Sequence, residues 1–241
     1  MLLPLVFLNE SAIGQGLVWN PPYWSLAYEV WFYALFGAAI FLKGWNRAAV
    51  LALIGLIAGW KILLMAPIWL MGAGLVRWQR QLCLPLTLAP LALLPGVAIC
   101  LAADAWAVPG VVAFSGLLGI EYQALGFSRY VLTDTAMGIG IALLFIGLRP
   151  LAEAAGPLLN RIAAPVRWLA GCSFTLYVLH NPILLLIRGY GIGAGDNVVV
   201  FVSLLVGVVG VCAGIAPLVE HGSPQLRRVM AERFGRRVVL A

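Results

Sequence analysis

Long apolar segments follow one another along almost the whole chain. A helix needs about 20 predominantly apolar residues to cross the hydrocarbon core of a bilayer. Charged residues make up only 10% of the chain, whereas they make up about 25% of a typical soluble domain. The pattern therefore predicts an all-α, polytopic transmembrane helix bundle of about seven spans that forms a single membrane domain over residues 1–241. The predicted spans lie near residues 24–42, 47–64, 66–77, 83–103, 131–148, 168–187 and 198–219.

The distribution of positive charge sets the number of spans. Lys and Arg accumulate in short cytoplasmic loops, and two segments, Ala66–Val76 and Val108–Leu118, are short for a span. If only the first of them crosses, 12 of the 15 Lys and Arg residues share one side, and the other three are Lys61, Arg129 and Arg188. If neither segment crosses, the Lys and Arg residues divide eleven to four between the two sides, and if both cross they divide nine to six. In both of these cases most of the positive charge lies outside. Seven spans therefore fit the charge bias best.

This charge bias also predicts the orientation of the chain. The amino terminus and the segment Asp104–Tyr130 are expected outside, and the basic tail, residues 220–241, in the cytoplasm. The expected location is the inner (plasma) membrane. Because the basic residues are loop anchors and a tail, we expect membrane lipids as partners and no nucleic acid.

Glu29 is a carboxylate within the first apolar span. An ionisable group at membrane depth costs at least about 2.5 kcal/mol, so such groups usually face a bundle interior or a polar cavity. Ser25, Phe32 and Tyr33 lie four residues before, three after and four after Glu29, so they share its helix face. Two interpretations remain open, a reaction or binding cavity and a structural polar tie between helices.

A second polar face is predicted in the span near 168–187. Pro182 removes one backbone donor and leaves the carbonyl of Val178 without its helical partner. The histidine of this face either serves the chemistry or satisfies that freed carbonyl. The polar side chains that share the face are Ser173, Tyr177, His180 and Asn181.

Three ionisable groups are expected in the outer half of the membrane. At ~1.5 Å rise per residue, Glu29 lies roughly 8 Å and His180 roughly 10 Å from the outer ends of their helices. Asp134 lies three or four residues into its own span, although Thr133 and Thr135 beside it also suit a helix start. If the three faces converge, Glu29 or Asp134 orients His180 or holds a proton, and an acceptor hydroxyl approaches from outside.

Both polar segments resemble one family. Trp24-Ser-Leu-x-x-Glu29-x-x-Phe32-Tyr33 resembles the W-S-L-x-x-E-x-x-F-Y signature of the acyltransferase-3 family, which are polytopic membrane enzymes. Ser173–His180 is similar to the S-Y-x-L-Y-L-x-H pattern of its penultimate span, with Phe174 where the first tyrosine is common. The resemblance implies transfer of an acyl group from a cytoplasmic thioester such as acyl-CoA to a hydroxyl of a saccharide or lipid-linked acceptor, for example O-acetylation in polysaccharide modification.

The resemblance also suggests roles for residues. Glu29 and His180 are the expected catalytic groups, and no bound cofactor and no metal is expected, because no cluster of His, Cys, Asp and Glu has ligand spacing. The family's essential histidine and an arginine motif lie in earlier spans, so we expect an upstream segment to complete the fold and this chain to be truncated and inactive alone. The expected substrate-binding residues are Trp24, Ser25, Tyr33, Asp134, Tyr177 and Asn181.

Two other functions fit the composition. A small transporter or lipid-handling protein also places kinked helices and intramembrane charges along a pathway. A non-catalytic structural subunit needs neither Glu29 nor His180 for activity. The sequence shows no paired repeat with matching broken helices, which disfavours a transporter.

Overall fold

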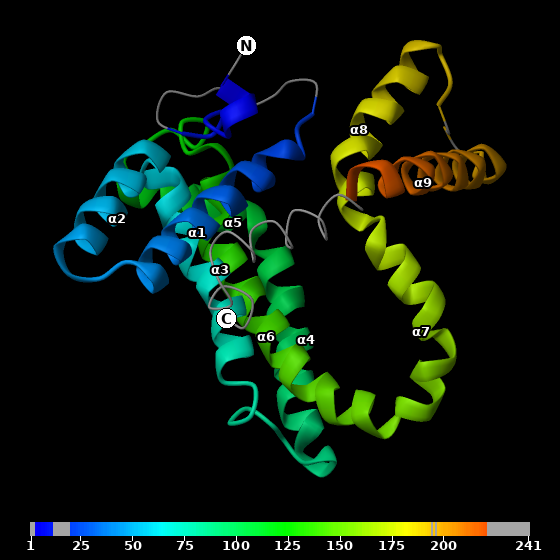
Figure 1. The fold of residues 1–241 in the computed structure, drawn as a ribbon, viewed down its shortest axis with the longest axis horizontal. Helices are drawn as coiled ribbons and strands as arrows, with labels where there is room; N and C mark the ends of the chain where they lie inside the picture. Colours follow the sequence, from blue (N-terminus) through cyan, green and yellow to red (C-terminus); the bar gives the residue numbers. More distant parts are fainter. Residues whose placement is uncertain (1–2, 12–19, 194, 196, 221–241) are drawn as a thin grey trace, which may run out of the picture. The chain divides into compact units, whose positions relative to one another are not determined.

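The computed structural model describes residues 3–11, 20–193, 195 and 197–220, and this part of the chain is helical, without a strand (Figure 1). The all-α prediction is therefore confirmed. Three 3-10 helices, η1 (Leu3–Val6), η2 (Leu86–Leu88) and η3 (Gly126–Tyr130), accompany the α-helices. The α-helices are α1 (Tyr23–Phe41), α2 (Gly44–Ala58), α3 (Trp60–Arg77), α4 (Ala89–Ala105), α5 (Ala107–Leu118), α6 (Val131–Ala154), α7 (Gly156–Gly171), α8 (Ser173–Gly189) and α9 (Val198–Glu220).

Several helices are long and apolar enough to cross a membrane. Among the described residues these are α1, α3, η2 with α4, η3 with α6, and α9. The consecutive helices α7 and α8 pass the same test together, although they are bent by 53° at their junction, which gives up to six spans. Counting the shorter apolar helix α2 as well gives the predicted number of about seven. The chain is therefore a multi-pass membrane protein.

The boundary between α2 and α3 differs from the expected spans near 47–64 and 66–77. Helix α2 ends at Ala58, and α3 begins at Trp60 and continues through Pro67. Gly59 between them has φ 85°, a left-handed conformation that glycine adopts without steric cost. The break therefore falls at this glycine, and α3 reaches 18 residues.

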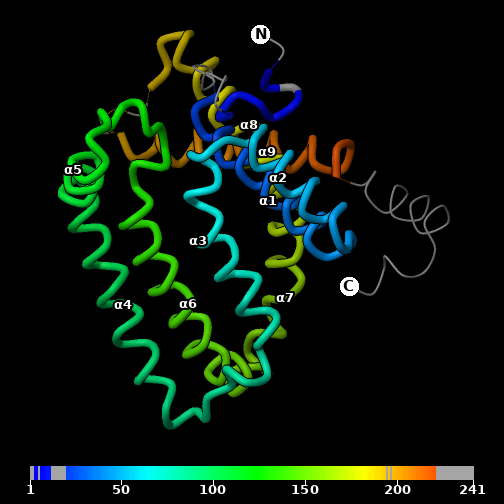
Figure 2. Tube along the Cα trace, turned by 90° about the vertical axis from the view of Figure 1, so that its left-hand side faces the viewer, coloured from blue at the N-terminus to red at the C-terminus, as the bar shows by residue number. Residues whose placement is uncertain are grey.

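The structure comprises two compact units. The first contains Trp24–Leu159 with the described part of Met1–Leu17, and the second contains Asn160–Ala241 with Val18–Tyr23, as far as these are described. In the first unit α6 packs between α4 and α3 (Figure 2). Its hydrophobic core also includes α1, α2 and α5, and its buried members are Tyr28, Phe32, Ala58, Ile62, Met65, Phe114, Leu125 and Val131.

Small residues bring α4 and α6 close together. A Cβ atom added at Gly140 of α6 would lie 3.0 Å from the carbonyl oxygen of Gly96 and 2.6 Å from Cys100 Sγ. One at Gly147 would lie 2.7 Å from Leu93 Cγ. Glycine thus permits a backbone approach that any side chain would block, as is common between membrane helices.

In the second unit α9 packs against α8 (Figure 1). The Glu220 carboxylate at the end of α9 accepts hydrogen bonds from the backbone N–H (2.9 Å) and the hydroxyl (2.6 Å) of Thr175, in the first turn of α8. A carboxylate at a helix N-terminus stabilises it, because the amides there lack intrahelical partners. Residues 221–241 of the predicted basic tail lie outside the described residues.

Candidate functional site

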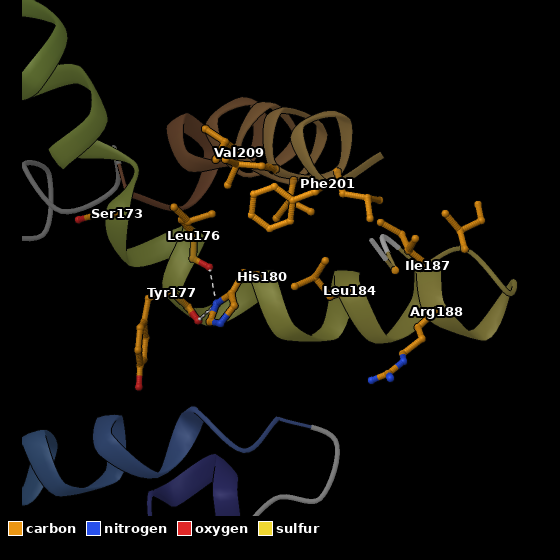
Figure 3. A pocket seen from close by; sticks show the side chains of 15 residues that line it. Ser173, Leu176, Tyr177, His180, Leu184, Ile187, Arg188, Phe201 and Val209 are labelled. Atoms are coloured by element: carbon orange, nitrogen blue, oxygen red, sulfur yellow. Dashed lines mark hydrogen bonds between the residues drawn. The ribbon is translucent and has the colours of Figure 1, made fainter. Parts of the chain in front are cut away.

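The ring of His180 is held by the backbone of its own helix. Its Nδ1 lies 3.0 Å from the carbonyl oxygen of Leu176 and 2.8 Å from that of Tyr177 (Figure 3). Both neighbours are acceptors, so Nδ1 carries the hydrogen and donates it. In the neutral ring Nε2 then has a lone pair and acts as a proton acceptor. The geometry therefore gives His180 the tautomer that a general base needs.

A groove of about 770 Å³ runs between α8 and α9 beside this histidine. Its wall is mostly leucine, isoleucine and valine with Phe201, and none of the described residues that line it is acidic. Leu184 and Ile187 of α8 point toward Phe201 and Val209 of α9 (Figure 3). The polar residues along its length are Ser173, Tyr177, His180 and Arg188. A basic nitrogen thus borders a long apolar groove.

The carbonyl freed by Pro182 has a partner other than His180. The side-chain amide of Asn20 donates to the carbonyl oxygen of Val178 at 3.1 Å. The interpretation in which His180 satisfies this carbonyl is therefore wrong. His180 Nδ1 instead contacts the carbonyls of Tyr177 and Leu176, which lie one and two residues before Val178. These contacts leave Nε2 of His180 available for another role.

A second bond ties the segment before α1 to α8. The hydroxyl of Tyr177 donates to the carbonyl oxygen of Pro22, and Asn20 lies two residues before that proline. The segment before α1 and the polar face of α8, both in the second unit, thus meet through Asn20 and Pro22. Sequence reasoning missed this contact, although the unpaired carbonyl of Val178 signalled that a side-chain donor must lie nearby.

Glu29 lies on an exposed face of α1 in the first unit. The hydroxyl of Tyr33 donates to Glu29 Oε1 at 3.3 Å, so the two share a helix face as the spacing predicts. The Tyr33 ring packs edge-on against Trp69 of α3, with ring centroids 5.6 Å apart, and Phe36 packs against the same tryptophan at 5.3 Å. Glu29 and His180 belong to different units, and the expected contact between them stays a prediction.

The other candidates have local environments. The Trp24 ring stacks on Phe127, with centroids 4.4 Å and planes 9° apart. Asp134 is half-buried near the start of α6, and the Thr133 hydroxyl donates to the carbonyl of Tyr130 at 3.0 Å. Ser25 lies half-buried on α1, and Asn181 half-buried on α8. Their expected role in substrate binding stays a prediction.

Comparison with known proteins assigns the chain to a class. A family profile described as an acyltransferase domain, that of the acyltransferase-3 family, matches residues 2–216. The chain belongs to this family. Together with the membrane-crossing helices, the match identifies a membrane acyltransferase in the general sense. No protein of curated function and no solved structure matches the chain.

The acyltransferase also contains a buried polar cluster that the sequence reasoning missed. Asn9, Glu10 and Ser11 are at most 8% exposed, and Asn9 Nδ2 donates to Glu10 Oε1 at 3.5 Å. Asn9 Oδ1 is buried without a hydrogen-bond partner among the described residues. The buried Tyr28 lies close enough to Glu10 for the two side chains to interact electrostatically. Burial raises the pKa of the Glu10 carboxyl, while the charge of Lys61 and the bond from Asn9 lower it.

No group of three or more His, Cys, Asp and Glu side chains with metal-binding geometry occurs among the residues that the structure describes. Among the described residues, the ionisable side chains at the candidate segments are the His180 imidazole and the carboxylates of Glu29, Asp134 and Glu10.

Proposed function

We propose that this acyltransferase transfers an acyl group from a thioester donor such as acyl-CoA to a hydroxyl of a saccharide or lipid-linked acceptor. Family membership supports the general reaction. The observation that carries the assignment of the base is the geometry of His180, whose Nδ1 hydrogen is held by two carbonyls and whose Nε2 is left as an acceptor beside the groove.

The proposed reaction needs one proton to move twice. His180 Nε2 takes the proton of the acceptor hydroxyl as its oxygen forms a bond to the thioester carbonyl carbon. The tetrahedral intermediate then expels the thiolate by breaking the C–S bond, and the imidazolium returns the proton to sulfur. The products are an ester and a free thiol, so atoms and charge balance. A positioned base of this kind contributes about 10²- to 10⁴-fold to the rate.

Glu29 is the second proposed catalytic group. The hydroxyl of Tyr33 donates a hydrogen bond to Glu29 Oε1 and holds the carboxylate in place. In this proposal the carboxylate stabilises the imidazolium of His180 or holds a proton during turnover. The proposed site lies in the outer half of the inner membrane and is open to an acceptor from outside.

The family resemblance also places an essential histidine in an upstream segment, and that segment is part of the proposal. We expect residues 1–241 alone to transfer little or nothing, and we expect transfer to appear when the segment is supplied. Robust transfer by residues 1–241 alone would contradict this part and leave His180 as the principal base.

The test is an acyl-transfer assay in membranes that contain the complete enzyme, with free thiol and acylated acceptor measured separately. We expect His180→Gln and Glu29→Gln each to lower transfer by about 10²-fold or more. Tyr33→Phe, which keeps the ring beside Trp69 and removes only the hydroxyl, should lower transfer by a smaller factor and so measures the contribution of its hydrogen bond to Glu29. Full activity in both His180→Gln and Glu29→Gln would overturn the proposed roles.

A further inference from the structure

The groove between α8 and α9 is larger than an acetyl group requires. Its volume of about 770 Å³ lies in the range of about 300 to 1,000 Å³ that is usual for sites holding whole small molecules. An acetyl group at His180 would leave most of the apolar wall without a contact. The groove therefore carries information about the acyl group, which the family match does not specify.

Its wall is apolar along one continuous direction from His180. Leu184 and Ile187 follow the histidine at four and seven residues, so the three side chains lie on one face of α8. Phe201 and Leu205 face them from α9. A hydrocarbon chain gains about 0.8 kcal/mol for each methylene that it buries against such a wall.

The length of the groove sets the length of the chain. Seven residues separate His180 from Ile187, which is roughly 10 Å along a helix. An extended alkyl chain with C–C bonds of ~1.5 Å advances by somewhat more than 1 Å per carbon. About eight carbons therefore cover the distance from the histidine to the far end of this apolar face.

The position of His180 beside the groove indicates that the groove binds a substrate rather than bulk lipid. It is a half-buried, ionisable side chain within the helix, and such residues in membrane spans mark substrate pathways. Among the described residues that line the groove, Nε2 of His180 is the only side-chain base, because Arg188 remains protonated and none of the others is acidic. An acyl chain in the groove would hold its thioester carbonyl beside that nitrogen.

We propose that the groove between α8 and α9 binds the hydrocarbon part of a medium-chain acyl group, about eight carbons long, with the thioester at His180. The inference rests on the proposed acyl transfer for its chemistry, and it specifies the donor as a medium-chain acyl thioester rather than an acetyl thioester. Its structural basis is the groove, which is independent of turnover.

The first experiment measures kcat/KM of the complete enzyme with acyl-CoA donors of two, four, eight and twelve carbons. Each buried methylene is expected to raise kcat/KM about fourfold, which is 0.8 kcal/mol converted to a ratio, until the groove is full near eight carbons. A preference for the two-carbon donor, or no dependence on length, would overturn the inference while leaving acyl transfer in place.

Two variants fill the groove from opposite walls, Leu184→Trp from α8 and Leu205→Trp from α9. Each should lower kcat/KM for the eight-carbon donor by about 10²-fold more than for the two-carbon donor, because only the longer chain meets the added ring. Leu186→Trp is the matched control, since Leu186 is 63% exposed on α8 and does not line the groove. Equal losses in all three variants would contradict the placement of the chain.

A binding measurement separates the two proposals. An eight-carbon thioester analogue with a photoreactive group at its methyl end should label peptides of α8 and α9, and Leu184→Trp should abolish the labelling. Labelling without transfer of any acyl group would contradict the proposed function and support the groove. Labelling elsewhere, or labelling by membrane lipid analogues with equal efficiency, would show that the groove holds bulk lipid and would overturn the inference.

Discussion

At the scale of single residues, Asn20 compensates for Pro182. The proline removes a backbone donor from α8, and Asn20 Nδ2 supplies another to the carbonyl of Val178. Asn20→Ala should therefore destabilise the fold by about 1 to 3 kcal/mol, the cost of leaving a buried polar group unpaired. Unfolding in detergent micelles, followed by circular dichroism, measures the change.

Pro182→Ala provides the control for this prediction. Alanine restores the N–H that the Val178 carbonyl lacks, so Asn20→Ala should cost much less in that background. The expected coupling between the two positions is of the order of 1 kcal/mol. An equal cost of Asn20→Ala in both backgrounds would mean that Asn20 stabilises the protein by some other contact.

Glu10 should make stability depend on pH. Burial raises the pKa of its carboxyl, so the folded state holds the proton more tightly than the unfolded chain does. Stability is then greatest below the unfolded pKa, near 4.5, and falls as pH rises through the folded pKa. Glu10→Gln should be free of this loss, so its stability relative to the natural protein should increase from about pH 4 to about pH 8. A constant difference across that range would contradict the prediction.

At the scale of helices, the contact between α4 and α6 depends on glycine. A Cβ at Gly140 would lie 3.0 Å from the backbone oxygen of Gly96, which cannot move without shifting α4. Gly140→Ala should therefore destabilise the protein by about 1 to 3 kcal/mol. Gly37→Ala in α1, where nothing lies within 4 Å, should instead be neutral or stabilising by up to about 1 kcal/mol. Thermal unfolding of both variants in the same detergent measures the contrast, and equal stabilities would contradict the close packing.

The sequence predicted most helices because apolar runs of spanning length leave the backbone few alternatives in a membrane. It placed the break before α3 too late, because the conformation of Gly59 is not encoded in the hydropathy pattern. In the candidate site, the spacing predicted the pairing of Glu29 with Tyr33, a contact within one turn. It did not predict Asn20 on Val178, which joins residues 158 positions apart. The burial of Asn9, Glu10 and Ser11 was missed for a different reason, because polar residues are usually exposed and nothing in the sequence indicates that these three are not.

At the scale of the whole molecule, the charge bias predicts the orientation in the membrane. Arg149 near the end of α6 donates to the carbonyl of Gln79, just beyond α3, and forms an ion pair with Glu153 at 3.1 Å. This contact places Arg149 beside the residues that follow α3, at one face of the first unit. The charge bias predicts that this face is cytoplasmic, and it separately predicts that the segment between α8 and α9 lies outside.

Reporter fusions test this orientation. A reporter that is active only on the non-cytoplasmic side of the membrane should be inactive when fused at Ala241 and active when inserted at Gly193, between α8 and α9. Single-cysteine labelling adds a second measurement, for which Gly193→Cys is a suitable site because a Cβ there meets nothing within 4 Å. We expect an impermeant thiol reagent to label it from outside in intact cells. Labelling only after the membrane is broken, together with an active reporter at Ala241, would show that the orientation is reversed. His180 would then lie near the cytoplasmic face. The acceptor would in that case have to be cytoplasmic as well.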